Sequence, residues 1–442
     1  IYMNVIGADV TASLVRRIEK RMHEIVARDM PITKSRWTRE EAVAYFKARG
    51  QEDTVRLLSY RPFDFFDVYT CDGLSEYFYG SMVESTGEAA SFALRFYYPG
   101  MVLLLPGNDL QGAPAPFVER PKLMRTYAEA NTCSRILRCE TAADLNDIIA
   151  RGETRSFIRV SEAMQERAVA QIADRVVANG ARVVFVAGPS SSGKTTFANR
   201  LSTQLRVCGK LPRAISLDNY YLDRDAIPAD ENGQKDLEHI NTLDIPRFSS
   251  DLAALMRGEQ VEVPVFDFLT GKRAKEGIVM QLHPDEPLII EGIHALNPML
   301  LNDDIDRDKL FRVYVSALTT LNIDDHNRIH TTDARLLRRL VRDYETRGAS
   351  MEHTLSMWPS VRRGEEKWIF PYQENADALF NTTLVYEVSV LKKYVYPLLQ
   401  EVPKESPCYA AARDITKVLN YFLDADGIED EIPPTSILRE FI

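Results

Sequence analysis

No uninterrupted apolar run in the 442 residues approaches the roughly 20 residues that a membrane-spanning helix needs. The opening segment, IYMNVIGADV, also lacks the basic start and the long apolar stretch of a secretory signal peptide. Internal repeats and low-complexity tracts are absent as well. The sequence therefore predicts a globular cytoplasmic protein without a membrane partner.

Cysteine is scarce: there are five, and no two of them form a CxxC pair. Scattered single thiols fit a reducing compartment and exclude a disulfide scaffold. Positive charge is also in deficit, because 54 Lys and Arg face 64 Asp and Glu, which gives a formal net charge of −10. Nucleic-acid binding relies on clustered positive charge, so we expect no nucleic-acid partner.

Two regions of different pattern follow each other along the chain. At about 100–200 residues per domain, the length predicts two or three domains. We expect the first domain, residues 1–150, to be an α+β unit. Its pattern predicts helices at 11–30 and 38–49 and strands at 55–70 and 89–105. Thr38 and Glu41 form a capping-box pair at the start of the second helix.

Residues 165–442 alternate short apolar runs with helical segments, after a mostly helical connection at 141–178. The runs RVVFVAG, RAISLD, LIIEG and FRVYVSA are typical of buried strands. Strands that alternate with helices build parallel sheets with helices on both faces. The second domain is therefore predicted to be α/β, with a doubly wound parallel sheet.

The strongest motif is Gly188-Pro-Ser-Ser-Ser-Gly193-Lys194-Thr195, which fits GxxxxGK[ST] between a strand and a helix. In such a P-loop, backbone N–H groups and the helix N-terminus hold phosphates. Lys194 would reach the β and γ phosphates, and the Thr195 hydroxyl would bind Mg²⁺. A chance Gly/Ser-rich turn does not account for this context. The motif predicts nucleoside triphosphate binding.

Two carboxylates follow predicted strands. Asp218 ends the strand ISLD, where it could accept a proton from a substrate hydroxyl, bind Mg²⁺, or do both. Glu291 ends the strand LIIEG and fits an acidic contact to the same metal ion. The alternatives are a strand-end turn for Asp218 and a solvent-facing loop for Glu291. His294, close behind, could approach the substrate or pack as a loop histidine.

Arginines recur at helical spacing in the segment 334–348. The stripe along one helix face consists of Arg335, Arg338, Arg339 and Arg342. Arginines can close over phosphates and stabilise the charge on a transferred phosphoryl group. The alternative is a solvated basic face that Asp343 and Glu345 neutralise.

Taken together, GPSSSGKTT, SLDNYYLDRD, PVFDFLTGKR and IIEGIHALNP resemble the uridine kinase / phosphoribulokinase family of P-loop kinases. The resemblance spans about 165–400 and includes the arginine segment, which is similar to the lid of uridine kinases. It implies an enzyme that moves the γ-phosphoryl group of ATP or GTP, with Mg²⁺, to the 5′-hydroxyl of a nucleoside. Uridine or cytidine is the first expectation.

The same resemblance implies roles for individual residues. The implied catalytic residues are Asp218, Lys194, Arg339 and Arg342. The implied nucleotide-binding residues are Gly188, Pro189, Ser190, Ser191, Ser192, Gly193, Lys194, Thr195 and Thr196. The implied substrate-binding residues are Asp218, Tyr220, Glu238, Phe266 and Arg273, and the implied metal ligands are Thr195, Asp218 and Glu291.

The segment that reads the pyrimidine departs from the family pattern. Uridine kinases carry a Tyr and a His at positions where this chain has Phe266 and Gly271. Losing polar groups that read a base edge weakens discrimination. Another nucleoside, a modified nucleoside or a different small hydroxyl compound therefore stays open as the substrate.

Residues 1–140 resemble the second N-terminal region of threonyl-tRNA synthetases, which is related to editing modules. Aligned on the Ser85-Thr86-Gly87 turn, the editing Cys and His positions become Phe78 and Met82. His23 is the only histidine before residue 239. We therefore expect no editing chemistry, because a metal-binding or proton-transfer cluster is missing.

A second hypothesis is a regulatory protein that senses a nucleoside triphosphate and contacts RNA through its N-terminal domain. The carboxylates and the arginine stripe in the second domain favour the kinase. Related kinases are often multimeric, so assembly of identical chains also stays open.

Overall fold

The computed structural model describes residues 1–5, 7–78, 80–107, 112–227, 238–267, 270–425 and 427–442. The chain divides into two compact units, Ile1–Arg120 and Pro121–Ile442. Residues 121–150, which the sequence pattern grouped with the first domain, belong to the second unit. Their first helix, α4, contacts strand β15 of that unit, and Lys122 donates hydrogen bonds to the carbonyls of Glu374 and Ala376.

The N-terminal unit is an α+β structure with two antiparallel sheets, ordered β1-β6-β5 and β2-β3-β4. Its helices are α1 Ala12–Ala27, α2 Arg39–Ala48 and α3 Glu52–Tyr60. Its strands are β1 Tyr2–Met3, β2 Thr33–Thr38, β3 Phe65–Cys71, β4 Leu74–Tyr77, β5 Ala93–Tyr97 and β6 Gly100–Leu104. The Thr38–Glu41 capping box is confirmed at the start of α2.

Residues 55–60 were expected to be a strand and are helical instead, as part of α3. Thr54, Leu57 and Leu58 are its buried residues, at the spacing that places three side chains on one helix face. Glu52 and Asp53 precede them in the first turn, where negative charge stabilises a helix. The apolar run therefore follows the helical period, and the strand begins only at Phe65.

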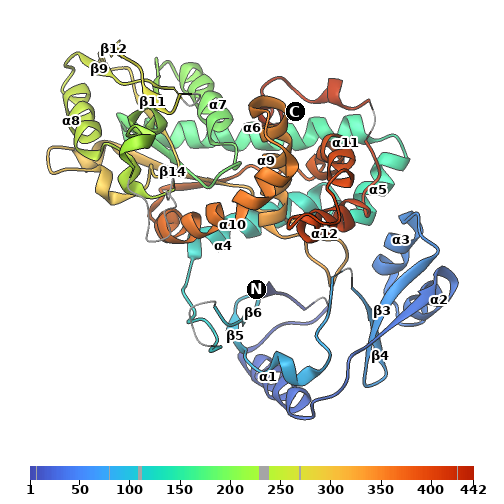
Figure 1. Cartoon of the computed structure of the whole chain (residues 1–442). Helices are drawn as coiled ribbons and strands as arrows, with labels where there is room; N and C mark the ends of the chain where they lie inside the picture. Colours follow the sequence, from blue (N-terminus) through green and yellow to red (C-terminus); the bar gives the residue numbers. More distant parts are fainter. Residues whose placement is uncertain (6, 79, 108–111, 228–237, 268–269, 426) are drawn as a thin grey trace. The chain divides into compact units, whose positions relative to one another are not determined.

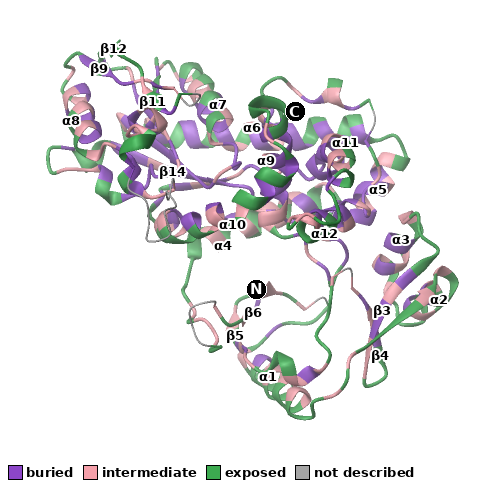
Figure 2. Ribbon diagram, in the orientation of Figure 1, coloured by how far each residue is buried: buried purple, intermediate pink, exposed green. Residues whose placement is uncertain are grey.

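The second unit is built around a five-stranded parallel sheet with the order β15-β14-β7-β13-β8. Its strands are β7 Val183–Ala187, β8 Arg213–Ser216, β13 Leu288–Glu291, β14 Leu310–Ser316 and β15 Ala378–Asn381. Two short two-stranded antiparallel sheets, β9 Val261–Val263 with β12 Ile278–Met280 and β10 Phe266–Asp267 with β11 Lys272–Arg273, lie outside it. Strand β7 lies at the centre of the strand order and is buried along its whole length. In Figure 2 its labelled neighbour β14 is drawn largely in the purple of buried residues.

Helices cover both faces of this sheet, as expected (Figure 1). The helices are α4 Pro121–Ile136, α5 Ala142–Ala150, α6 Thr154–Asn179, α7 Lys194–Val207, α8 Ile245–Met256, α9 Thr331–Arg347, α10 Met351–Trp368, α11 Glu387–Gln400 and α12 Tyr409–Leu419. Phe248 and Leu252 of α8 join Val183 and Phe185 of β7 in one apolar cluster. Helix α7 contacts β7 and β13 and takes no part in that cluster.

None of the helices in the described part of the chain combines the length and the apolar composition that crossing a bilayer requires.

A buried ion pair joins α9 to α11. Arg338 and Glu387 have side chains that are 0% and 1% exposed. The Arg338 guanidinium also donates to the Thr382 carbonyl at 2.9 Å and to its hydroxyl at 3.0 Å. Thr382 in turn donates to the Ser192 carbonyl at 2.7 Å. The helix is thereby tied to the loop that follows β7.

Removing Arg338 should destabilise the fold strongly. In Arg338→Ala, Glu387 is left as a buried charge without its partner, which typically costs about 3–5 kcal/mol. Urea denaturation followed by tryptophan fluorescence measures the loss. Arg125→Ala is the matched control, because its pair with Glu129 is exposed, and should cost less than about 1 kcal/mol. Equal losses in the two variants would contradict a structural role for the buried pair.

Candidate active site at the carboxyl edge of the sheet

The loop from Gly188 to Gly193 connects β7 to α7 and depends on both glycines. At Gly188 there is no room for a Cβ, because the Val315 carbonyl and the Ser192 hydroxyl occupy its place. Gly193 has a φ of +83°, a left-handed conformation that side chains disfavour, and it forms the N-cap of α7. The motif thus has the strand–loop–helix setting that phosphate binding needs.

Lys194 and Thr195 open helix α7. The Lys194 ammonium donates to the Pro189 carbonyl at 3.2 Å and is half-buried. Thr195 is exposed at the helix N-terminus. Both side chains therefore lie where the N–H groups of the first helical turn face outward.

Asp218 and Glu291 meet beside this loop because their strands are neighbours. Glu291 ends β13 and pairs in register with Ser216 of β8, two residues before Asp218. Burial raises the pKa of Asp218 to about 6, the Glu291 carboxylate adds to the rise, and the Lys194 ammonium opposes it. The structure thus brings together three residues that the sequence singled out separately.

Glu238 belongs to the same cluster. Burial raises the pKa of its carboxyl to about 7, while Arg339 and Lys194 favour the ionised form and Glu365 and Asp218 oppose it. Helix α10 packs closely on this side, since the Glu238 side chain occupies the space next to Gly364. Two half-buried carboxyls with pKa values near neutral are typical of functional sites.

The arginines of α9 divide into two kinds. Arg335 and Arg338 are buried and structural: Arg335 donates to Glu365 at 2.7 Å and to the Ser190 carbonyl at 3.0 Å. Arg339 instead reaches the hydroxyl of Ser190 at 2.9 Å, which places it at the P-loop. The predicted stripe is therefore not one functional surface.

Asp343 forms ion pairs with three arginines of the same helix. Its side chain is 6% exposed and lies 3.1 Å from Arg339, 2.8 Å from Arg342 and 3.3 Å from Arg347. One buried carboxylate thus holds three guanidinium groups on the side of α9 that faces the site. Arg347, which we did not predict, favours the ionised form of Asp218.

Three of the predicted substrate-binding side chains are engaged in packing. Tyr220 is buried and donates to Asp251 at 3.1 Å. Phe266 is buried, with its ring 5.7 Å from that of Tyr221. Arg273 pairs with Asp244 at 3.0 Å and donates to the carbonyls of Tyr220 and Tyr221. These contacts hold the loop after β8, so Asp218 and Glu238 are the predicted substrate-binding residues that remain at the site.

Two further residues at the site escaped the sequence analysis or were left open by it. Glu365 is fully buried and accepts a hydrogen bond from the Ser190 N–H at 3.2 Å. His294 is 1% exposed and lies near Glu238 and Lys194. Burial lowers its pKa to about 4, so its imidazole is neutral at physiological pH. Glu365 lies in the charged run RRGEEK, whose pattern gave no signal of its contact with the P-loop.

In the described residues, no group of three or more His, Cys, Asp or Glu forms an all-protein metal cage. Mg²⁺ is usually held by one or two carboxylates together with substrate phosphates and water. Asp218, Glu291 and the exposed Thr195 hydroxyl at the P-loop match that donor set.

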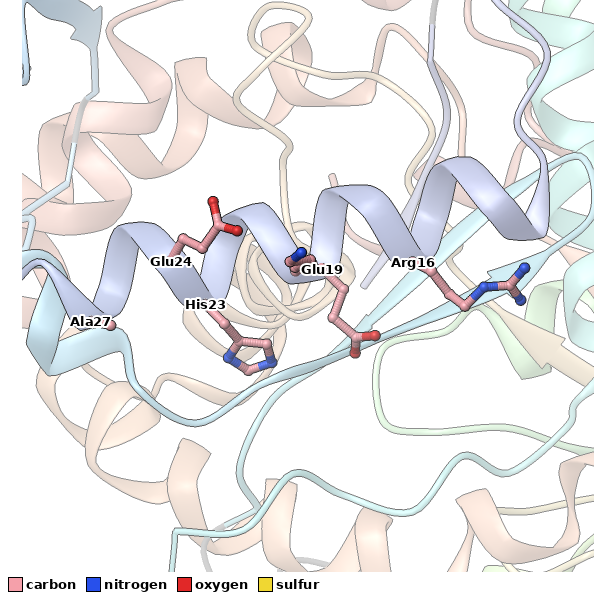
Figure 3. Close-up of a pocket in the computed structure, with 6 residues that line it drawn as sticks. Arg16, Glu19, His23, Glu24 and Ala27 are labelled. Carbon is pink, nitrogen blue, oxygen red and sulfur yellow. The ribbon is translucent and has the colours of Figure 1, made fainter.

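The N-terminal unit has a separate surface hollow of about 800 Å³ along α1. Figure 3 shows that its labelled side chains all come from this one helix. His23 stacks on Phe92 at 4.4 Å, and Glu19 accepts from the Leu94 N–H at 2.7 Å. These polar groups serve the packing of the unit, so the hollow offers no converging chemistry.

A GxxxxGK loop after the central strand of a parallel sheet, facing two strand-end carboxylates and an arginine-bearing helix, defines a P-loop kinase. The family model described as "Phosphoribulokinase / Uridine kinase family" matches residues 183–389. A uridine kinase of Staphylococcus epidermidis is 31% identical over 202 residues, covering 46% of this chain and 87% of its own length. The chain belongs to the phosphoribulokinase / uridine kinase family.

Two further proteins are similar to this chain. A uridine kinase of Staphylococcus aureus is 30% identical over 198 residues, covering 45% of this chain and 86% of its own length. The structure of a possible uridine kinase from Bacillus stearothermophilus is 20% identical and covers 49% of this chain and 98% of that one, with a TM-score of 0.32. That last similarity is too low to add to the assignment.

Glu238→Gln should stabilise the nucleotide-free protein at neutral to alkaline pH. The pKa of Glu238 in the folded protein, about 7, lies above its ordinary value of 4.5, so ionisation costs stability as the pH rises through this window. At about pH 8 the variant should gain about 1–3 kcal/mol, and the difference should vanish below about pH 4.5. Urea denaturation across this range measures it.

Glu405→Gln, which changes an exposed carboxylate elsewhere in the unit, is the control and should show no such pH dependence. A stability difference for Glu238→Gln that stays constant over the whole pH range would contradict the raised pKa.

Proposed function

We propose that this protein is a kinase that transfers the γ-phosphoryl group of ATP or GTP to the 5′-hydroxyl of a nucleoside, with uridine or cytidine as the first candidates. The observation that carries the proposal is the convergence of Lys194, Asp218 and Glu291 at the P-loop. The membership in the phosphoribulokinase / uridine kinase family and the named uridine kinases among the relatives support it.

Asp218 is the proposed base for the acceptor hydroxyl. With a pKa of about 6, it is largely ionised at physiological pH yet basic enough to accept the hydroxyl proton as the oxygen attacks. Phosphoryl transfer asks the protein mainly to position the reactants and to neutralise charge. Lys194 supplies positive charge at the β and γ phosphates.

Arg339 and Arg342 would add positive charge from α9 as the phosphoryl group moves. Arg339 already lies at the Ser190 hydroxyl, and Asp343 orients both guanidinium groups. Thr195, Asp218 and Glu291 are the groups that would hold Mg²⁺. When bound, the ion supplies charge neutralisation on the phosphate oxygens.

This chain has Phe266 and Gly271 where pyrimidine-reading relatives carry a Tyr and a His, and the backbone at Gly271 disfavours a side chain. Gly271 lies in the turn of the β10–β11 hairpin with a φ of +69°, and a Cβ there would come within 2.5 Å of the Arg224 side chain. A histidine at this position would be strained and would clash. Glu238, which we propose holds the ribose hydroxyls, and the neutral His294 are polar groups that remain.

The test is a coupled ADP-release assay with Mg²⁺-ATP and a panel of uridine, cytidine, adenosine, guanosine and inosine. Turnover with uridine or cytidine supports pyrimidine use without the Tyr and His readers. Turnover with another nucleoside makes Phe266 and Gly271 the positions that shifted specificity. Nucleotide binding without turnover on any of the five would overturn the nucleoside kinase proposal.

Asp218→Asn should lower kcat by about 10²–10⁴-fold, because the amide cannot accept the hydroxyl proton. Affinity for ADP should change little, because Lys194 and the P-loop backbone remain. Asp225→Asn is the matched control: Asp225 lies in the same loop region but is 83% exposed and pairs only with Lys272 among the described ion pairs. Steady-state kinetics on an accepted nucleoside measure both, and wild-type turnover by Asp218→Asn would remove it from the mechanism.

A cytoplasmic location, the absence of a nucleic-acid partner and the synthetase-like character of the N-terminal domain remain predictions from the sequence.

A further inference from the structure

A segment near the end of the chain lies against the P-loop. The short helix η9, Ile437–Glu440, contacts α7. Ile437 is fully buried, and a Cβ on Gly193 would come within 2.7 Å of its Cγ2. The ring of Phe441 lies 5.2 Å from the Arg338 guanidinium, in cation–π contact. The glycine of the GK pair is therefore covered by a side chain from more than 240 residues away.

Glu440 places its carboxylate at the N-terminus of α7. The Thr196 hydroxyl donates to the Glu440 Oε2 atom at 2.6 Å, and the Thr196 N–H donates to the same oxygen at 3.3 Å. The N-cap of this helix is Gly193, which has no side chain to accept from the first turn. Glu440 thus supplies from outside the helix the negative group that its N-terminus favours.

The N–H and hydroxyl of Thr196, which donate to Glu440, are donors that a bound phosphate also needs. Backbone N–H groups of a P-loop and of the following helical turn cradle the phosphates of a nucleotide. A carboxylate and a phosphate cannot share the Thr196 N–H and hydroxyl, because both are anions and each donor has one proton to give. The Lys194 ammonium bonds to the Pro189 carbonyl, and no ion pair joins it to Glu440 in the described residues.

The segment is held in place by contacts that do not involve Glu440. The Ser436 hydroxyl donates to the buried Glu162 carboxylate. Arg439 donates to the carbonyls of Glu429 and Ile432 at 2.6 and 2.8 Å. The half-buried Glu440 side chain can therefore turn away from Thr196 while Ile437 and Phe441 stay in place.

We propose that Glu440 is a residue of the donor-nucleotide site that competes with the nucleotide's phosphates for the N-terminus of α7. This inference rests on the proposed function only in that the P-loop binds a nucleotide. When the site is empty, Glu440 caps the helix. When a nucleotide enters, its phosphate replaces the carboxylate, so each binding event includes the release of this internal anion. The carboxylate thereby lowers the affinity of the site and sets the nucleotide concentration at which it fills.

The experiment measures binding to the full chain without an acceptor, by titration calorimetry with ADP and with pyrophosphate, and the melting temperature of the empty protein. In Glu440→Gln, the dissociation constants for both probes should fall about 3- to 10-fold. The same substitution should lower the melting temperature of the empty protein, because the helix cap is weakened. Pyrophosphate carries no base or sugar, so tighter binding of both probes locates the competition at the phosphates.

Glu429→Gln is the matched control, because this carboxylate pairs with Lys393 in the same part of the chain and does not contact the P-loop in the described structure. It should leave both dissociation constants unchanged. Unchanged or weaker binding by Glu440→Gln would overturn the competition and leave Glu440 as a structural cap only. Failure of the wild-type protein to bind ADP would overturn the P-loop assignment itself, and this inference with it. Nucleoside turnover plays no part in the readout, so the acceptor proposal can fail without affecting this one.

Discussion

The buried carboxylate of Glu365 is the contact on which the geometry of the site depends. It accepts hydrogen bonds from the Ser190 N–H and from Arg335 and also pairs with Arg362 at 3.1 Å. A carboxylate that is fully removed from water is tolerated only when several donors replace its hydration. Satisfying Glu365 therefore requires the P-loop, α9 and α10 to lie together. The same requirement leaves Arg339, one helical turn further along, at the phosphate loop.

Two opposite electrostatic imbalances lie side by side at the P-loop. Burial, together with the repulsion among neighbouring carboxylates, raises the pKa values of Asp218 and Glu238, although Lys194, Arg339 and Arg347 favour the ionised forms. Close to these carboxylates, the N-terminus of α7 has no capping side chain of its own, and the Glu440 carboxylate caps it instead. A metal–nucleotide complex has the charges to correct both, because its cation suits the carboxylates and its phosphates suit the helix. Charge arrangements with raised carboxyl pKa values of this kind are characteristic of functional sites.

The parts of the site that could be predicted from the sequence are those encoded locally. The P-loop requires its two glycines because of one left-handed residue and one close backbone approach, and such needs leave a readable motif. Asp218 and Glu291 could be placed because residues that follow parallel strands meet at one edge. The expected strand at residues 55–60 was wrong, because the buried Leu57 and Leu58 lie on one face of helix α3. The boundary near residue 120 was missed because α4 finds its partners in the second unit.

The sequence by itself determined the class of chemistry: a phosphate-binding loop, the carboxylates that follow neighbouring strands, and a helix rich in arginine. Only the tertiary structure decided which arginines are available for that chemistry, since Arg338 neutralises a buried glutamate while Arg339 faces the loop. It also brought Glu365 and Glu440 to the P-loop from 175 and 244 residues away. The physical reason is that a charge's role depends on its solvation and its partners. Those are set by contacts between distant segments, which spacing along the chain does not record.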